Sequence, residues 1–167
     1  MSILRKTDPP LRNPLVFAGS FGYTGFIGPM RGTSGTFAAF LFAVLLYFVE
    51  IPDLAFVFLV VAAASSLASY VTGVLLLNSM PDQHDPGWFV LDEVAGFFLC
   101  SSLIGPQTLL DICWAFLVFR YYDIAKPWPV KTFERIPGSA GILLDDLAAG
   151  VLAAFTVIAV KALIVWA

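Results

Sequence analysis

The sequence predicts an all-α fold, an integral membrane bundle of about five transmembrane helices. Of the 167 residues, 59% are hydrophobic and only 13% are charged, which is about half the charged share of a soluble domain. The mean hydropathy of +0.88 points the same way. A soluble chain of this length cannot bury so much apolar surface, and lipid favours helices because their backbone groups find partners internally. We expect residues 1–167 to form one membrane-embedded domain.

Five apolar stretches are the predicted membrane helices: residues 36–49, 54–77, 88–104, 108–122 and 142–166. A membrane helix needs about 20 apolar residues. The second and fifth stretches meet this length, and the other three reach it with their flanks. Residues 1–27 are predicted to form a polar N-terminus followed by a short interfacial or re-entrant segment, because residues 15–27 are apolar but rich in glycine and serine.

The basic residues predict the orientation. Eight of the nine Lys and Arg residues lie before the first stretch, at the end of the fourth, or between the fourth and fifth. Only Lys161 falls toward the other side. Cytoplasmic loops of membrane proteins carry an excess of Lys and Arg, so the N-terminus is predicted to be cytoplasmic. The net charge of −3 gives no basic field and argues against nucleic acid as a partner.

Acidic residues lie at the predicted cytoplasmic ends of three helices. Asp92 and Glu93 begin the third stretch, and Asp145 and Asp146 begin the fifth. Each acid in a span costs about 2.5–3.5 kcal/mol on insertion, and clustered carboxylates repel one another. A divalent cation would compensate them, and oxygen ligands suit Mg²⁺ or Mn²⁺. We therefore predict these four as metal ligands or as residues that hold the ligands; solvated helix ends are the simpler alternative.

Small residues accompany these acids. Gly96 follows Asp92 by four residues, and Gly150 follows Asp146 by four. Residues four apart share a helix face, and small residues allow membrane helices to approach closely. The acids are thus predicted to face a neighbouring helix.

Cations are predicted beside the acids. Arg120, Asp123 and Lys126 are spaced by three and share one face, up to Pro127. They are either snorkelling side chains at the membrane edge or a cradle for phosphate, and the adjacent acids favour the cradle. The Gly-rich residues 28–36, which include Arg31, are either an anion site at a helix start or a helix start capped by Ser34 or Thr36. Arg31 is predicted to bind phosphate on its charge alone.

Metal, carboxylates and cations together indicate phosphoryl transfer, with metal-activated water as the nucleophile. Asp123 would be a further ligand or would orient that water. A small cation channel or transporter with a carboxylate cluster is the alternative function, and a structural subunit of a lipid-synthesis complex is another. The single histidine, His84, is too few for a zinc site; it is either an acid–base group or a solvated loop residue.

Three motifs resemble those of the phosphatidylglycerophosphatase A family: HDPGWFVLDEVAG at 84–96, FRYYDIAKPWPV at 119–130 and GILLDDLAAG at 141–150. Residues 29–36 resemble the family's glycine-rich entry, except that Met30 and Arg31 replace its usual Ala-Pro. The motifs occur in order and span nearly the whole chain.

The resemblance implies a lipid phosphatase of phospholipid biosynthesis. Its substrate would be phosphatidylglycerophosphate, its products phosphatidylglycerol and phosphate, and its cofactor Mg²⁺. The site would lie on the cytoplasmic face of the bacterial inner membrane. By motif position, the resemblance also implies functional roles for Asp85, Asp92, Glu93, Arg120, Asp123, Lys126, Asp145 and Asp146. Among these, Asp85 and Asp123 are the expected catalytic residues.

Overall fold

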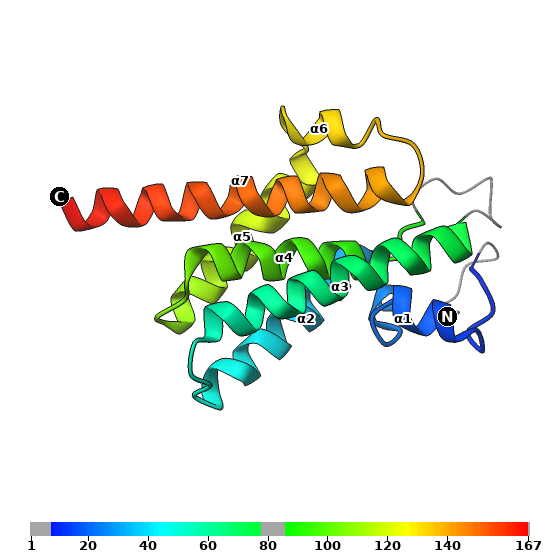
Figure 1. The fold of residues 1–167 in the computed structure, drawn as a ribbon, viewed down its shortest axis with the longest axis horizontal. Coiled ribbons are helices and arrows are strands. Elements are labelled where there is room, and N and C mark those ends of the chain that lie inside the picture. Colours follow the sequence, from blue (N-terminus) through cyan, green and yellow to red (C-terminus); the bar gives the residue numbers. More distant parts are fainter. Residues whose placement is uncertain (1–7, 78–85, 167) are drawn as a thin grey trace.

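The computed structural model describes residues 8–77 and 86–166, and all the regular elements in these ranges are helices. In chain order they are α1 (Pro14–Gly19), the 3₁₀ helix η1 (Thr24–Phe26), α2 (Arg31–Phe48), α3 (Leu54–Leu77), α4 (Leu91–Ile104), α5 (Leu109–Ala125), α6 (Val130–Phe133) and α7 (Ser139–Trp166). The predicted all-α fold is confirmed. Its five longest helices correspond to the five apolar stretches (Figure 1).

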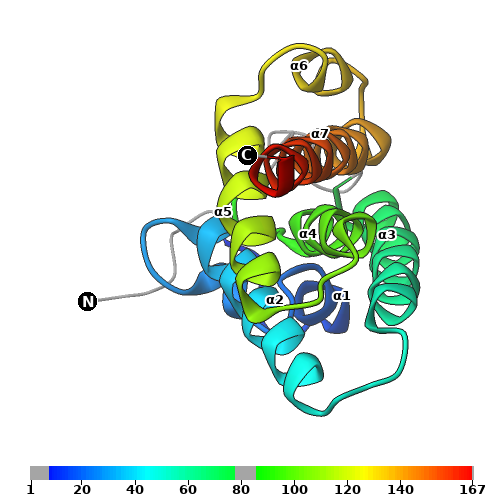
Figure 2. The ribbon, with the colours of Figure 1, turned by 90° about the vertical axis from the view of Figure 1, so that its left-hand side faces the viewer.

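Helix α4 forms the centre of the bundle. It packs against α2, α3, α5 and α7, which surround it when the bundle is viewed end-on (Figure 2). Ten of its 14 residues are buried, including Phe97 and Phe98. A helix that is apolar on nearly every side is stable only when other helices cover it. The position of α4 therefore follows from its sequence.

Within the described residues, three helices are long and apolar enough to cross a membrane: residues 31–48, 54–76 and 139–164. Helix α4, with 14 residues, and α5, with 17, extend about 21 and 25 Å, which is short of the roughly 30 Å hydrocarbon core. The predicted count of about five membrane helices therefore remains a prediction. Large apolar side chains such as Leu45, Leu67 and Leu163 are exposed on the outside of the bundle, as expected for a surface that faces lipid.

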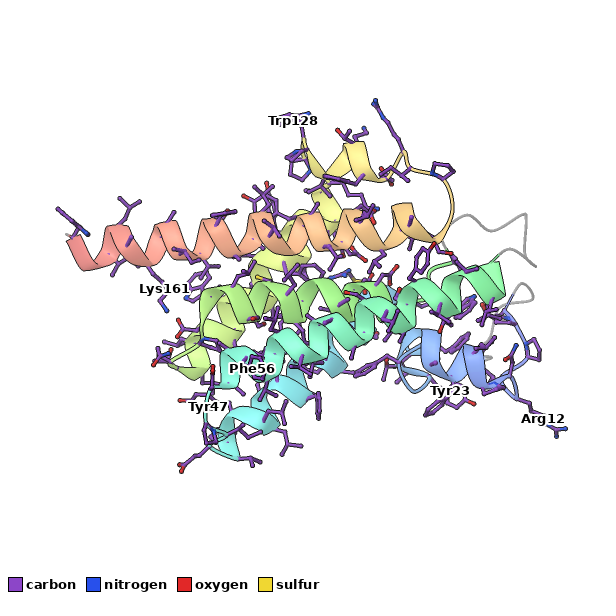
Figure 3. All side chains as sticks on the ribbon, viewed as in Figure 1. Arg12, Tyr23, Tyr47, Phe56, Trp128 and Lys161 are labelled. Carbon is purple, nitrogen blue, oxygen red and sulfur yellow. The ribbon has the colours of Figure 1, made fainter. Side chains whose placement is uncertain are left out.

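A different basic residue marks each end of the bundle. Arg12 and Lys161 lie at opposite ends of the molecule (Figure 3). At the end marked by Lys161, its ammonium donates to Asp111 Oδ1 over 2.6 Å. Asp111 also forms a capping box with Thr108 at the start of α5. This ion pair joins α5 to α7 at the end remote from the start of α4.

Residues 15–27 form α1, η1 and their connections rather than one continuous segment. The N–H of Val90 donates to the carbonyl of Gly19 over 2.9 Å, and Phe26 stacks on Trp88 with ring centroids 5.7 Å apart. These contacts fix the chain just before α4 begins. They thereby help to position the first residues of α4.

Helices α4 and α7 cross in backbone contact. A Cβ atom at Gly96 would lie 2.5 Å from the carbonyl oxygen of Asp146, and one at Gly150 would lie 2.4 Å from the carbonyl oxygen of Gly96. Only glycine fits at either position. The close approach predicted from the spacing of acids and glycines is thus present, and it brings the acidic starts of the two helices together.

We predict that Gly96→Ala lowers the stability of the bundle. The added methyl group must push α4 from α7, and overpacking of this kind costs about 1–3 kcal/mol. Unfolding of the purified protein in detergent, followed by circular dichroism, measures the change. Gly87→Ala is the matched control, because a Cβ atom at Gly87 meets nothing within 4 Å. Equal stability of the two variants would contradict the proposed contact.

Candidate active site

A small cavity of about 70 Å³ lies where the starts of α2, α4 and α7 meet the end of α5. Its charged lining consists of Asp92, Glu93, Asp123, Lys126, Asp145 and Asp146. Gly32, Gly87, Phe89 and Ile142 complete the wall. The structure therefore brings together the four acids predicted to hold a metal, the acid predicted to orient water and one predicted phosphate-binding cation.

The two acidic pairs are arranged alike. In α4, Asp92 Oδ1 accepts the N–H of Glu93 over 2.9 Å, and in α7, Asp145 Oδ1 accepts the N–H of Asp146 over 3.1 Å. Asp92, Asp145 and Asp146 are at most 5% exposed. In both pairs, one carboxylate oxygen of the first acid is thus fixed by the backbone. The pairs face one cavity because α4 and α7 cross one turn further along.

Arg120, which lies in α5, forms ion pairs with two of the acids. Its Nη1 pairs with Asp123 and lies 3.2 Å from Glu93 Oε1. The same nitrogen donates to the hydroxyl of Thr36 over 3.2 Å, and Nη2 donates to the hydroxyl of Thr33 over 3.1 Å. Arg120 thus ties α5 to α4 and α2. Its Nε is buried and has no partner within the described residues.

Thr33 and Thr36 are site residues that the sequence did not identify as such. The Thr36 hydroxyl donates to Glu93 Oε2 over 3.0 Å while it accepts from Arg120. The prediction that Ser34 or Thr36 caps this helix is wrong. Helix α2 starts at Arg31, Met30 is its N-cap residue, and no side chain caps it. The three-residue spacing of Thr33 and Thr36 on one helix face was the signal available.

Gly32 gives Glu93 the space it occupies. A Cβ atom at Gly32 would lie 2.1 Å from Glu93 Oε1. The side chain of Glu93 thus packs against Gly32 in the first turn of α2. Helix α2 begins at Arg31, five residues before the predicted start at Thr36.

Lys126 reaches the cavity from just beyond α5. It does not continue the helix with Arg120 and Asp123; its backbone is left-handed, with φ of 40° and ψ of 56°. The following Pro127 explains this, since proline disfavours the α-helical region for the residue before it. The ammonium lies 2.5 Å from Asp145 Oδ2 and 3.2 Å from Glu134 Oε1. Burial lowers the pKa of Lys126, but these ion pairs outweigh burial and leave the pKa above its ordinary value.

One further predicted position, Arg31, lies away from the cavity. Arg31 does not line the cavity; its guanidinium forms two 2.7 Å hydrogen bonds with the carboxylate of Asp8 and lies 5.6 Å from the ring centroid of Phe26. Asp85 and His84 lie outside the described residues. Their roles, and phosphate binding by Arg31, remain predictions.

A larger hollow lies away from this chemistry. It measures about 570 Å³ and is lined by the α2–α3 and α4–α5 connections, including the exposed Glu50 and Asp53. It contains no Lys or Arg in its lining. The small cavity is the candidate active site because it combines buried acids with a cation.

Fold and site together define a helical protein with apolar helices long enough to cross a membrane and a buried carboxylate–cation site near one end of its bundle. A sequence model of the family described as Phosphatidylglycerophosphatase A matches residues 17–161. The chain belongs to this family, as its motifs indicated.

Curated relatives agree with that assignment. The phosphatidylglycerophosphatase A of Haemophilus influenzae is 32% identical over 155 residues, 90% of this chain and 91% of the relative. The protein of the same name from Escherichia coli is 36% identical over 72 residues, 42% of each chain. A Bacteroides thetaiotaomicron protein with the provisional name phosphatidylinositol-3-phosphatase is 29% identical over 143 residues, 83% of this chain and 87% of the relative. No solved structure matches the chain.

We predict that Arg120→Met destabilises the protein, because Glu93 and Asp123 lose the buried cation between them. Removing one partner of a buried ion pair costs about 3–5 kcal/mol. Unfolding in detergent measures the loss. Adding Glu93→Gln to Arg120→Met should restore part of it, since the uncompensated carboxylate is then removed. Strictly additive losses would show that Arg120 and Glu93 do not interact.

Proposed function

We propose that the protein hydrolyses phosphatidylglycerophosphate to phosphatidylglycerol and phosphate by metal-activated water, as a step in phospholipid biosynthesis. The observation that carries the proposal is the cavity in which acids from α4, α5 and α7 surround a site beside Lys126. Family membership supports the activity, because two curated relatives carry the name of this enzyme.

The donor set fits Mg²⁺ or Mn²⁺. Five carboxylates line the cavity, and hard oxygen ligands are what these ions prefer. With the acids ionised, Lys126 and Arg120 together leave three negative charges uncompensated, which a divalent cation would reduce. In the described residues no three His, Cys, Asp or Glu side chains already have the spacing of a metal site. Metal binding would therefore require small side-chain movements, such as release of Asp145 from Lys126.

A bound divalent ion would polarise a phosphoryl oxygen and make water a stronger nucleophile. Asp92, Glu93, Asp145 and Asp146 are the proposed residues that hold it. Asp123, fixed by Arg120, would orient the attacking water and accept its proton. Lys126 would bind the phosphate oxygens, and Arg120 would chiefly position Glu93 and Asp123. Asp85 is a further proposed catalytic residue.

The proposed location is the bacterial inner membrane, with the N-terminus and this site on the cytoplasmic side. The charge bias of the sequence supports that orientation. The alternative of a cation channel predicts acids near the middle of the bilayer and polar residues along a whole span. Here the acids of α4 lie in its first turn, and Asp145 and Asp146 lie in the N-terminal part of α7, so the enzyme is the better account of them.

We expect the purified protein to release phosphate from phosphatidylglycerophosphate, to stop when the divalent ion is chelated and to recover with added Mg²⁺. Asp146→Asn should lower turnover by about 10–100-fold or more, since it removes a charge from the metal-binding set. Phosphate release from lipid–detergent micelles is the measurement.

Glu50→Gln is the control for Asp146→Asn, because Glu50 is an exposed acid at the other hollow. It should retain wild-type turnover. Phosphatidylinositol 3-phosphate serves as the second substrate, given the name of the Bacteroides relative. Turnover that survives both chelation and Asp146→Asn would refute the metal mechanism.

Lys126→Met should reduce kcat/KM by about 10–100-fold, because a charge-assisted hydrogen bond to phosphate is worth about 1.5–3 kcal/mol. The loss should fall largely on KM if the contact forms with the bound substrate. Steady-state kinetics measure both constants. Lys131→Met, which removes an exposed lysine from α6, should have no effect. Equal losses in the two variants would mean that overall charge, rather than Lys126, matters.

A further inference from the structure

An apolar groove runs along the outer face of α7 and starts beside the active site. Its volume is about 430 Å³. The floor is one face of α7: Leu144, Leu147, Ala148, Val151, Leu152 and Phe155. These residues recur at spacings of three and four, so they form a continuous stripe along the helix. The stripe adjoins the α7 face of Ala149 and Ala153, which is buried in the bundle core, and its Ala148 and Leu152 pack partly against that core.

Helix α6 and the segment before it form the other wall. Pro129 and Phe133 line the groove, and α6 lies over α7 on the side away from α4 (Figures 1 and 2). Trp128, next to Pro129, points away from the bundle and is 84% exposed (Figure 3). Tryptophan is enriched where the membrane meets water. Its position therefore places the α6 wall at the level of lipid headgroups.

Residues that line the groove lie next to residues of the catalytic cavity along the chain. Leu144 in the groove directly precedes Asp145 in the cavity. Lys126, which contacts Asp145, lies three residues before Pro129 of the groove wall. A molecule with its phosphate at Lys126 would thus find an apolar path beginning within a few residues of its headgroup.

The length of the groove suits a lipid chain. Leu144 and Phe155 are eleven residues apart, which is about 16 Å along a helix. One leaflet of the hydrocarbon core is about 15 Å deep. A chain lying in the groove would extend from the headgroup level to about the middle of the bilayer.

We propose that this groove binds one acyl chain of the phospholipid substrate while the phosphate occupies the cavity. The inference rests on the proposed function. It assigns to α6 and to the outer face of α7 the recognition of the lipid tail, which the carboxylates and Lys126 cannot provide. Short α6 therefore acts as a wall that separates the substrate chain from bulk lipid.

The experiment compares three substrates: long-chain phosphatidylglycerophosphate, its short-chain analogue and the deacylated headgroup. Ala148→Phe fills the groove near its start, and Val151→Phe fills it about one turn deeper. Ala148→Phe should lower kcat/KM about tenfold for both lipids, the equivalent of about two buried methylenes. Val151→Phe should lower it only for the long-chain lipid. Neither should change turnover of the headgroup, which serves as the test of an intact site.

Val160→Phe is the matched control, because it adds the same bulk as Val151→Phe to an exposed position on α7 outside the groove. It should leave the preference between the lipids unchanged. Equal losses on lipids and headgroup would place the damage in the site and overturn the proposal. Unchanged chain preference in both groove variants would assign the groove to bulk lipid, or to a second copy if their oligomeric state also changed. A wild-type protein inactive on every substrate would instead refute the proposed function itself.

Discussion

Helices α4 and α7 touch through their backbones at Gly96 and Gly150, and the other features of the site depend on that crossing. Each helix carries a pair of acids about one turn before its glycine. The crossing therefore determines how far apart the two pairs lie. A side chain at either glycine would separate the helices and open the cavity. The bundle thus achieves its most polar region by removing side-chain bulk one turn away from it, among otherwise apolar helices.

Buried acids at this crossing need compensating charge, and the protein supplies it from different directions. Arg120 holds Glu93 and Asp123 with the help of two threonine hydroxyls from α2. Lys126 holds Asp145 from the chain beyond α5. Every helix at the site therefore contributes to a network in which acids are fixed by hydrogen bonds before any ligand arrives.

Local patterns in the sequence were sufficient for the five longest helices and for the gathering of the acids at one end of the bundle. Hydropathy and residue spacing predicted the bounds of α3 and the glycines at the crossing, because both are properties of single helices. Tertiary contacts decided the rest. The charge of Arg31 could not reveal its pairing with Asp8, which lies 23 residues earlier. Nor could the spacing of Arg120 and Lys126 show that Pro127 removes the lysine from their shared helix face.

The backbone of Lys126 has a wider consequence. Its φ of 40° lies in the left-handed region, which costs a non-glycine residue about 1–2 kcal/mol. Glycine would end α5 there without that cost, but it would remove the ammonium from the cavity. Backbone strain and the charge of the cavity therefore favour different residues at this position. Engineering the chain for thermostability by optimising helix ends would favour glycine here and so remove a cation from the cavity.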